Sequence, residues 1–299
     1  METIQKIDKH EGSYLSSGLR AALDLIRVDK QYGTLLVLLP ALWTLFLASE
    51  GKPDLLLLAI IITGAFFMRS AGCAINDIAD RNFDPHVERT MNRPLAAGRL
   101  TLPKASIIFL LAVLFSAFLT FYLNSLAVIL SVFCLFFVIL YPFTKRIISL
   151  PQLFLGIAFG WGSIIVWAAV REEVALPAFI IFLSTVTWAV AYDTVYAMMD
   201  IEDDLRIGVK SSAILFGRYV KEIVAFFFAI TTLLLIGLGI VSKLGVPFYL
   251  SLAAASYIFS RQTVLTGKGM DREAAFRAFK SNVTAGIIIL AGIILDYII

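Results

Sequence analysis

Two clusters of acidic residues stand at the ends of apolar segments in this chain. The first cluster occupies residues 76–84 (NDIADRNFD), and the second occupies residues 193–204 (DTVYAMMDIEDD). A carboxylate at the edge of a membrane is costly unless it pairs with a cation, so such clusters indicate a functional site more than a solvated helix end. Mg²⁺ takes carboxylate oxygens together with the phosphates of a substrate. The clusters therefore predict a membrane-embedded site for a metal-complexed diphosphate.

The spacing within each cluster predicts which side chains face the same way. If the preceding helix continues through the first cluster, Arg69, Asn76 and Asp80 lie within about 20° of one line, with Asp77 and Asp84 flanking it. An arginine at this depth either faces inward with Asn76 or extends to the lipid headgroups.

The second cluster follows the same rule, because residues 7 and 11 positions apart lie close to whole helical turns. Asp193, Asp200 and Asp204 are then aligned within about 20° on one helix. Two helices are thus expected to present carboxylates to a shared cavity, where each stripe would carry a Mg²⁺ that bridges phosphate oxygens.

Basic residues near the clusters have two interpretations. They either bind a diphosphate through charge-assisted hydrogen bonds or only set the membrane topology. The candidates are Arg81, Lys145, Arg146 and Lys210. Some of the many aromatic side chains could shield a carbocation through their π faces, although most are expected to face lipid or to pack.

The elements that position these residues are predicted to be transmembrane helices. The chain has 299 residues, of which 60% are hydrophobic and 16% charged, whereas a soluble domain carries about a quarter charged residues. Nine apolar runs are long enough to cross a bilayer: roughly 31–49, 55–75, 105–123, 125–143, 147–170, 174–192, 223–242, 244–260 and 281–299. Residues 105–144 carry no charge, and Asn124 is expected to mark a hairpin there. We therefore predict an all-α polytopic membrane protein, one domain over residues 1–299, with nine helices around a central cavity open to the cytoplasmic side.

The orientation follows from the lysines and arginines. With a cytoplasmic N-terminus, 22 of the 25 basic residues fall in inside segments, as the positive-inside rule requires. Both acidic clusters then face the cytoplasm, the C-terminus lies outside, and a bacterial inner membrane is the expected location. Residues 1–30 have no pattern of a cleaved signal peptide.

Other classes of site find little support. Cys73 and Cys134 lie within apolar runs and imply neither a disulfide framework nor zinc. Two histidines are too few and too far apart for a histidine metal site. No basic–aromatic pattern indicates nucleic acid. Gly156 and Gly160 form a small-xxx-small pair, which is typical of close helix packing.

The two clusters resemble the paired signatures of the UbiA-type intramembrane prenyltransferases. Residues 76–84 read N-D-x-x-D-x-x-x-D, and residues 192–204 read Y-D-T-x-Y-A-x-x-D-x-x-D-D. The resemblance extends to residues 89–98, 141–146 and 208–212, and to residues 27–30 followed by Gly33 and Pro40. Within the superfamily, the combination is most similar to the 4-hydroxybenzoate polyprenyltransferases of ubiquinone biosynthesis. One departure is that Ile201 and Glu202 stand where Arg and Asp are expected.

The resemblance implies a Mg²⁺-dependent aromatic prenyl transfer. Two Mg²⁺ ions would be held on an allylic polyprenyl diphosphate by five aspartates: Asp77, Asp80, Asp84, Asp200 and Asp204. Further substrate contacts are implied for Lys145, Arg146, Lys210 and Tyr192. Arg69 and Asn76 would orient 4-hydroxybenzoate, and Asp193 would either assist phenol deprotonation or position Lys210.

Two alternatives stay open at this point. Another aromatic acceptor, such as homogentisate or dihydroxynaphthoate, would preserve the mechanism. A cation-coupled transporter would use the aspartates as ion sites, but transporters usually place such sites near the midplane at broken helices.

Overall fold

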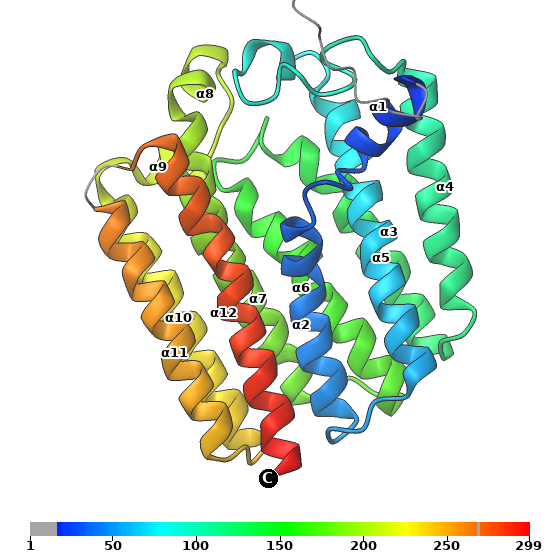
Figure 1. The fold of residues 1–299 in the computed structure, drawn as a ribbon, viewed down its shortest axis with the longest axis vertical. Helices are drawn as coiled ribbons and strands as arrows, with labels where there is room; N and C mark the ends of the chain where they lie inside the picture. The colour runs from blue at the N-terminus through cyan, green and yellow to red at the C-terminus, as the bar shows by residue number, and fades with distance from the viewer. Residues whose placement is uncertain (1–16, 268–269) are drawn as a thin grey trace, which may run out of the picture.

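Long helices run side by side along the molecule in the computed structural model of the chain (Figure 1). The structure describes residues 17–267 and 270–299. Residues 1–16, on which the signal-peptide prediction partly depends, lie outside the described part. Nine long helices of the described residues correspond one to one with the nine predicted apolar runs. They are α2 (Tyr32–Ala48), α3 (Leu55–Asp80), α4 (Leu102–Thr120), α5 (Ser125–Thr144), α6 (Pro151–Arg171), α7 (Leu176–Ala197), α10 (Val220–Val241), α11 (Val246–Thr266) and α12 (Arg272–Ile298).

Seven helices of the described chain are long and apolar enough to cross a membrane: α3 to α6, α7 with its continuation to Ile207, α10 with the segment from Ser212, and α12. Helix α2 is apolar but has only 17 residues. Helix α11 is less apolar because Ser256, Ser260, Arg261 and Gln262 lie in it. The all-helical, multi-span prediction is therefore confirmed, whereas the crossing of all nine helices stays a prediction.

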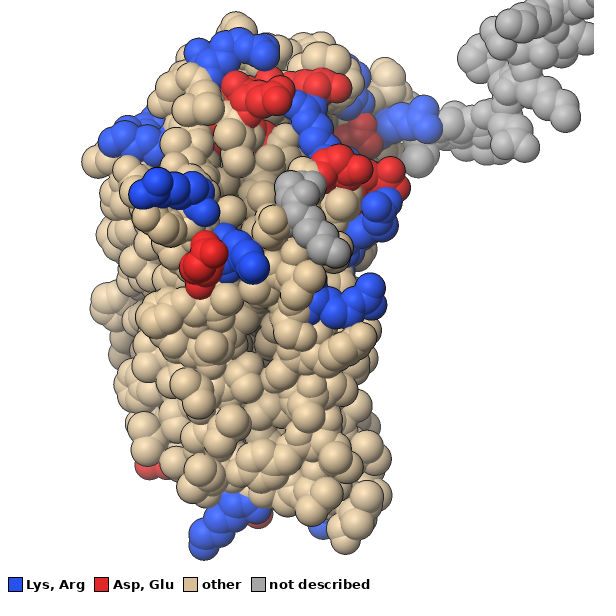
Figure 2. All heavy atoms as spheres, turned by 90° about the vertical axis from the view of Figure 1, so that its left-hand side faces the viewer, with Lys and Arg blue, Asp and Glu red and all other residues tan. Residues whose placement is uncertain are grey.

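Short elements gather at one end of the bundle. They are α1 (Ser17–Leu25), the 3₁₀ helix η1 (Asp84–His86), η2 (Met198–Asp200), α8 (Ile201–Ile207), α9 (Ser212–Phe216) and η3 (Gly217–Tyr219). On the face shown in Figure 2, charged side chains crowd this end and reach about half-way down, and the rest of the face carries charge only near the opposite tip. This charge distribution is the one that a membrane-crossing bundle requires.

The core packs where small residues let helices approach. A Cβ at Gly156 would lie 2.9 Å from the Val186 backbone, and one at Gly160 would lie 2.9 Å from the Phe182 carbonyl oxygen. The predicted close packing at this glycine pair, which joins α6 to α7, is thereby confirmed.

The predicted hairpin at Asn124 is also confirmed. The Asn124 side chain accepts a hydrogen bond from the Ala127 amide at 3.0 Å, which caps the start of α5. Its amide group donates to the Ala168 carbonyl at 2.7 Å and so ties the hairpin to α6.

Candidate active site

The first acidic cluster is carried by two elements instead of one. Helix α3 extends past the apolar run and ends at Asp80, so Asn76, Asp77 and Asp80 share its last turns. The expected continuation of the helix through Asp84 is wrong, because Asp84 begins η1 after a turn. Pro85 prevents a continuous α-helix here, since a proline ring clashes with the carbonyl four residues earlier, which is that of the C-cap residue Arg81.

The second cluster departs from a straight helix in the same way. Asp193 lies on α7, Asp200 ends the 3₁₀ turn η2, and Asp204 lies on α8. The expected alignment on one continuous helix is therefore wrong. The three aspartates nevertheless line a single cavity, because the backbone turns at η2.

This cavity has a volume of about 850 Å³ and is lined by many charged side chains. Its acidic lining residues number ten: Asp24, Asp29, Asp77, Asp80, Asp84, Glu88, Asp193, Asp200, Asp204 and Glu273. Its basic lining residues number nine: Arg27, Lys30, Arg69, Arg89, Arg93, Arg99, Lys145, Lys210 and Arg272. Asn76 and Tyr192 also line it. The structure thus brings together eleven of the thirteen predicted site residues.

Arg81 and Arg146 are the two predicted residues that lie outside the cavity lining. Arg81 is exposed and donates to the Ile78 carbonyl at 3.0 Å. Arg146 donates to the Ala79 carbonyl and places its guanidinium 5.1 Å from the centre of the Phe83 ring. Both cations therefore satisfy carbonyl groups at the C-terminal end of α3, where a helix favours positive charge.

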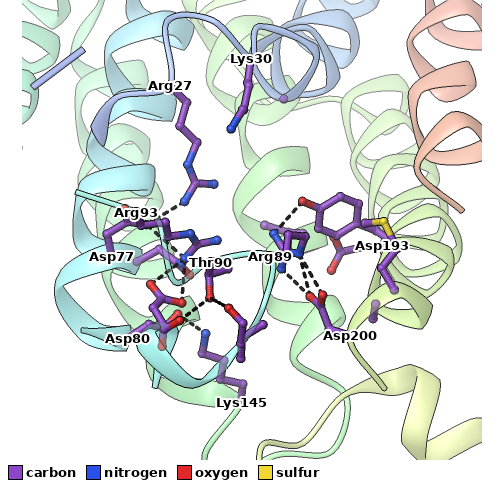
Figure 3. Close-up of a pocket in the computed structure, with 18 of the residues that line it drawn as sticks. Arg27, Lys30, Asp77, Asp80, Arg89, Thr90, Arg93, Lys145, Asp193 and Asp200 are labelled. Atoms are coloured by element: carbon purple, nitrogen blue, oxygen red, sulfur yellow. Dashed lines mark hydrogen bonds and ion pairs between the residues drawn. The ribbon is translucent and has the colours of Figure 1, made fainter. Parts of the chain in front are cut away.

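The carboxylates of the first cluster are held by arginines (Figure 3). Asp77 Oδ1 lies 2.7 Å from Arg27 and 3.2 Å from Arg93. Arg93 also lies 2.9 Å from Asp84 Oδ2. Burial raises the pKa of the Asp84 carboxyl, and the positive charge of Arg93 opposes that rise.

Two more motif carboxylates, Asp80 and Asp200, are paired with cations in the same manner. Lys145, at the end of α5, forms an ion pair with the buried Asp80. Arg89 donates to both oxygens of Asp200, with distances of 2.5 to 3.0 Å. Its NH1 group donates to the Tyr196 hydroxyl at 2.9 Å, and its guanidinium lies 4.9 Å from the centre of that ring. Arg89 therefore contacts both the Asp200 carboxylate and the Tyr196 ring.

The donor set fits a hard divalent cation. Asp77 Oδ2 and Asp80 Oδ1 are buried and have no hydrogen-bond partner among the described residues. An unpartnered buried carboxylate oxygen is unfavourable unless a cation or a donor reaches it. No three acidic side chains of the described chain are already gathered around a common metal position. Coordination would thus need phosphate oxygens as well, which is how Mg²⁺ usually binds.

The deeper wall of the cavity carries a cation without a carboxylate partner. Arg69 donates to the Cys73 thiol sulfur at 2.8 Å and makes no ion pair with a described residue. Its guanidinium packs against Gly33, where a Cβ would lie 2.8 Å from NH2. Tyr192, on α7, also lines the cavity, and its hydroxyl is buried and has no partner among the described residues. The Arg69 guanidinium could therefore bind an anionic group of a ligand, with the Tyr192 hydroxyl also available in the cavity.

Three arginines of the site were not among the predicted site residues: Arg27, Arg89 and Arg93. They were counted only as charges that set the topology. They could have been found from the sequence, because they lie within residues 27–30 and 89–98, two segments that resemble the family. Buried arginines usually have carboxylate partners, so arginines in polar loops next to aspartate clusters were candidates for pairing.

The helical fold and the cavity with its two aspartate clusters are those expected of an intramembrane prenyltransferase. The chain matches the UbiA prenyltransferase family over residues 37–283 and belongs to that family. It is 45% identical to a 4-hydroxybenzoate octaprenyltransferase of Aeromonas hydrophila, over 93% of this chain and 96% of the relative. It is 44% identical to a 4-hydroxybenzoate octaprenyltransferase of Serratia proteamaculans, over 96% of this chain and 99% of the relative.

Solved structures agree on the fold. The chain superimposes on a UbiA homologue from Aeropyrum pernix K1 with a TM-score of 0.77 and 26% identity, covering 88% of this chain and 97% of that one. A UbiA homologue from Archaeoglobus fulgidus, solved with GPP and Mg²⁺, has a TM-score of 0.67 at 14% identity, over 93% of this chain and 100% of that one. At 14% identity, that second likeness concerns the fold alone.

Proposed function

We propose that this protein transfers a polyprenyl group from an allylic polyprenyl diphosphate to 4-hydroxybenzoate, at the ring carbon ortho to the hydroxyl. The observation that carries the proposal is a single cavity lined by aspartates of both clusters and by Arg69, which lies on α3 and makes no ion pair with a described residue. The two relatives named above support the acceptor. The setting is ubiquinone biosynthesis.

Divalent metal is part of the proposal. Two Mg²⁺ ions would be held by Asp77, Asp80, Asp84, Asp200 and Asp204, and would supply neutralisation of the departing diphosphate. The orphaned oxygens of Asp77 and Asp80 support this assignment, and the Archaeoglobus fulgidus homologue of the same fold was solved with Mg²⁺ bound.

The cavity residues would divide the remaining tasks. Lys145 and Lys210 bind the diphosphate as its carbon–oxygen bond breaks and both bonding electrons pass to oxygen. Arg69 binds the acceptor carboxylate, with Asn76 and Tyr192 beside it, and thereby turns the ortho carbon toward the allylic carbon. The ring electrons form the new carbon–carbon bond, and the ortho proton then leaves. Asp193 is the carboxylate placed to take up a proton from the acceptor. Burial in the bundle keeps water from the allylic cation.

The membrane arrangement is part of the same proposal. We infer nine crossings in one domain over residues 1–299, with the cavity and N-terminus in the cytoplasm and the C-terminus outside, in a bacterial inner membrane. The crowding of charged side chains, many of them Lys or Arg, at one end in Figure 2 supports this orientation, because the positive-inside rule puts the more basic side in the cytoplasm.

The test uses the full chain purified in detergent with Mg²⁺, geranyl diphosphate and 4-hydroxybenzoate, and follows the mass of the product. Asp80→Ala and Asp200→Ala should abolish product. Glu202→Ala is the matched control, because Glu202 belongs to the second cluster but is exposed and lies outside the cavity. Product with homogentisate or dihydroxynaphthoate, and none with 4-hydroxybenzoate, would retain the mechanism and replace the acceptor.

A further inference from the structure

The carboxylates expected to bind metal already have cationic partners in the ligand-free site. Four of the five are paired: Asp77 with Arg27 and Arg93, Asp80 with Lys145, Asp84 with Arg93, and Asp200 with Arg89. Asp77 and Asp80 have side chains that are 1% exposed, so water screens these ion pairs little. Protein cations thus balance most of the negative charge of these carboxylates, although Asp77 Oδ2 and Asp80 Oδ1 have no hydrogen-bond partner among the described residues.

This pairing changes what a metal ion meets. Because ten acidic and nine basic side chains line the cavity, its charge is close to balanced before any ligand enters. A divalent cation that arrives alone must compete with a guanidinium or an ammonium for each carboxylate and leaves an excess of positive charge. A diphosphate that arrives alone meets carboxylates as well as cations, and like charges repel at short range in a weakly screened site.

Both difficulties disappear when metal and diphosphate enter together. The metal can take the carboxylate oxygens, and the released cations can take the phosphate oxygens. We propose that Arg27, Arg89, Arg93 and Lys145 are exchangeable counter-ions, which hold the motif aspartates in the empty site and pass to the phosphates on loading. Metal and diphosphate therefore bind cooperatively, each weakly alone. This inference rests on the proposed use of a metal–diphosphate complex.

The positions of the cations suit such an exchange. Arg27 lies in the connection between α1 and α2, with a left-handed φ of 56° that is unusual outside glycine. Arg89 and Arg93 lie in the irregular segment between η1 and α4, and Lys145 follows the last residue of α5. The aspartates lie on helices or short helical turns. The side chains that must move are thus carried by connections, and the carboxylates stay on the bundle.

The first experiment measures metal binding without catalysis. Binding of Mn²⁺ to the full chain in detergent is followed by electron paramagnetic resonance, with Mn²⁺ alone and with preformed Mn²⁺–inorganic diphosphate. We expect at least roughly tenfold tighter binding with diphosphate, within the usual range of coupling between sites. Metal should tighten diphosphate binding by the same factor, since coupling is reciprocal. Equal affinity of Mn²⁺ with and without diphosphate would overturn the proposal.

Variants separate exchange from simple support of the fold. Arg89→Gln and Lys145→Met each free one aspartate, so each should bind Mn²⁺ alone more tightly and diphosphate more weakly than the unaltered chain. Arg171→Gln is the matched control: Arg171 pairs with Glu50, 2.6 Å away, and neither residue lines the cavity. It should change neither affinity. Looser Mn²⁺ binding in both folded test variants would mean that the cations only support the carboxylates.

The outcome is independent of the acceptor assay. Absence of prenylated product with cooperative Mn²⁺–diphosphate binding would overturn the proposed transfer and leave the exchange standing. Formation of prenylated product without cooperative binding of Mn²⁺ and diphosphate would support the proposed transfer and overturn the counter-ion exchange.

Discussion

Replacing Gly33 by alanine should weaken acceptor binding by displacing Arg69. A Cβ at position 33 would lie 2.8 Å from NH2, 2.9 Å from Nε and 3.2 Å from Cζ of Arg69. Distances of this kind require one partner to move. Gly33 is part of helix α2, whereas the guanidinium is the far end of a flexible side chain that borders the open cavity. The guanidinium should therefore move, and the fold should remain.

The size of the effect follows from the contact that Arg69 is proposed to make. A hydrogen bond to a charged group contributes about 1.5 to 3 kcal/mol, which corresponds to roughly 10- to 100-fold in affinity. A displaced guanidinium keeps part of this interaction. We therefore expect Gly33→Ala to raise the KM for 4-hydroxybenzoate by roughly tenfold and to leave the KM for geranyl diphosphate unchanged.

Steady-state assays of the detergent-purified enzyme, with one substrate varied at a time, measure this difference. Gly162→Ala is the matched control, because a Cβ there would meet only the Ala41 Cβ, at 3.9 Å. The decisive comparison is the double variant. If Gly33 acts through Arg69, Gly33→Ala should have no further effect on the acceptor KM in an Arg69→Gln background. The same loss in both backgrounds would refute the reasoning.

Three further outcomes are expected. Asp203→Ala should raise the KM for the diphosphate several-fold without changing the acceptor KM, because the Asp203 carboxylate accepts from the Glu88 amide at 3.3 Å and so holds the loop that carries Arg89 in place from outside the cavity. Removal of metal with EDTA should reduce product mass to background, and added Mg²⁺ should restore it. Gly292→Ala should lower the Tm, through about 1–3 kcal/mol of overpacking against Ser251, whereas Gly237→Ala, which has no atom within 4 Å, should not.

The helices were predictable because their signals are local. A run of apolar residues long enough to cross a bilayer and a concentration of charge at its ends are both properties of neighbouring residues. All nine long helices of the described chain were found in this way, and the Asn124 hairpin followed from one polar residue within a charge-free stretch. The breaks at Asp84 and before Asp200 were not predicted, because helical spacing was extended past points where the backbone turns.

The identity of the acidic clusters was likewise visible in residue types and spacing, and so was their need for cations. Which cation reaches which carboxylate was not visible. Arg27 and Asp77 are 50 positions apart, and Arg89 and Asp200 are 111 positions apart. Their contacts depend on how helices pack and where loops cross the cavity. Such contacts are set by the free energy of the whole fold, which no short stretch of the chain contains, so only the tertiary structure decided the pairing of the arginines and the exclusion of Arg81 and Arg146 from the cavity.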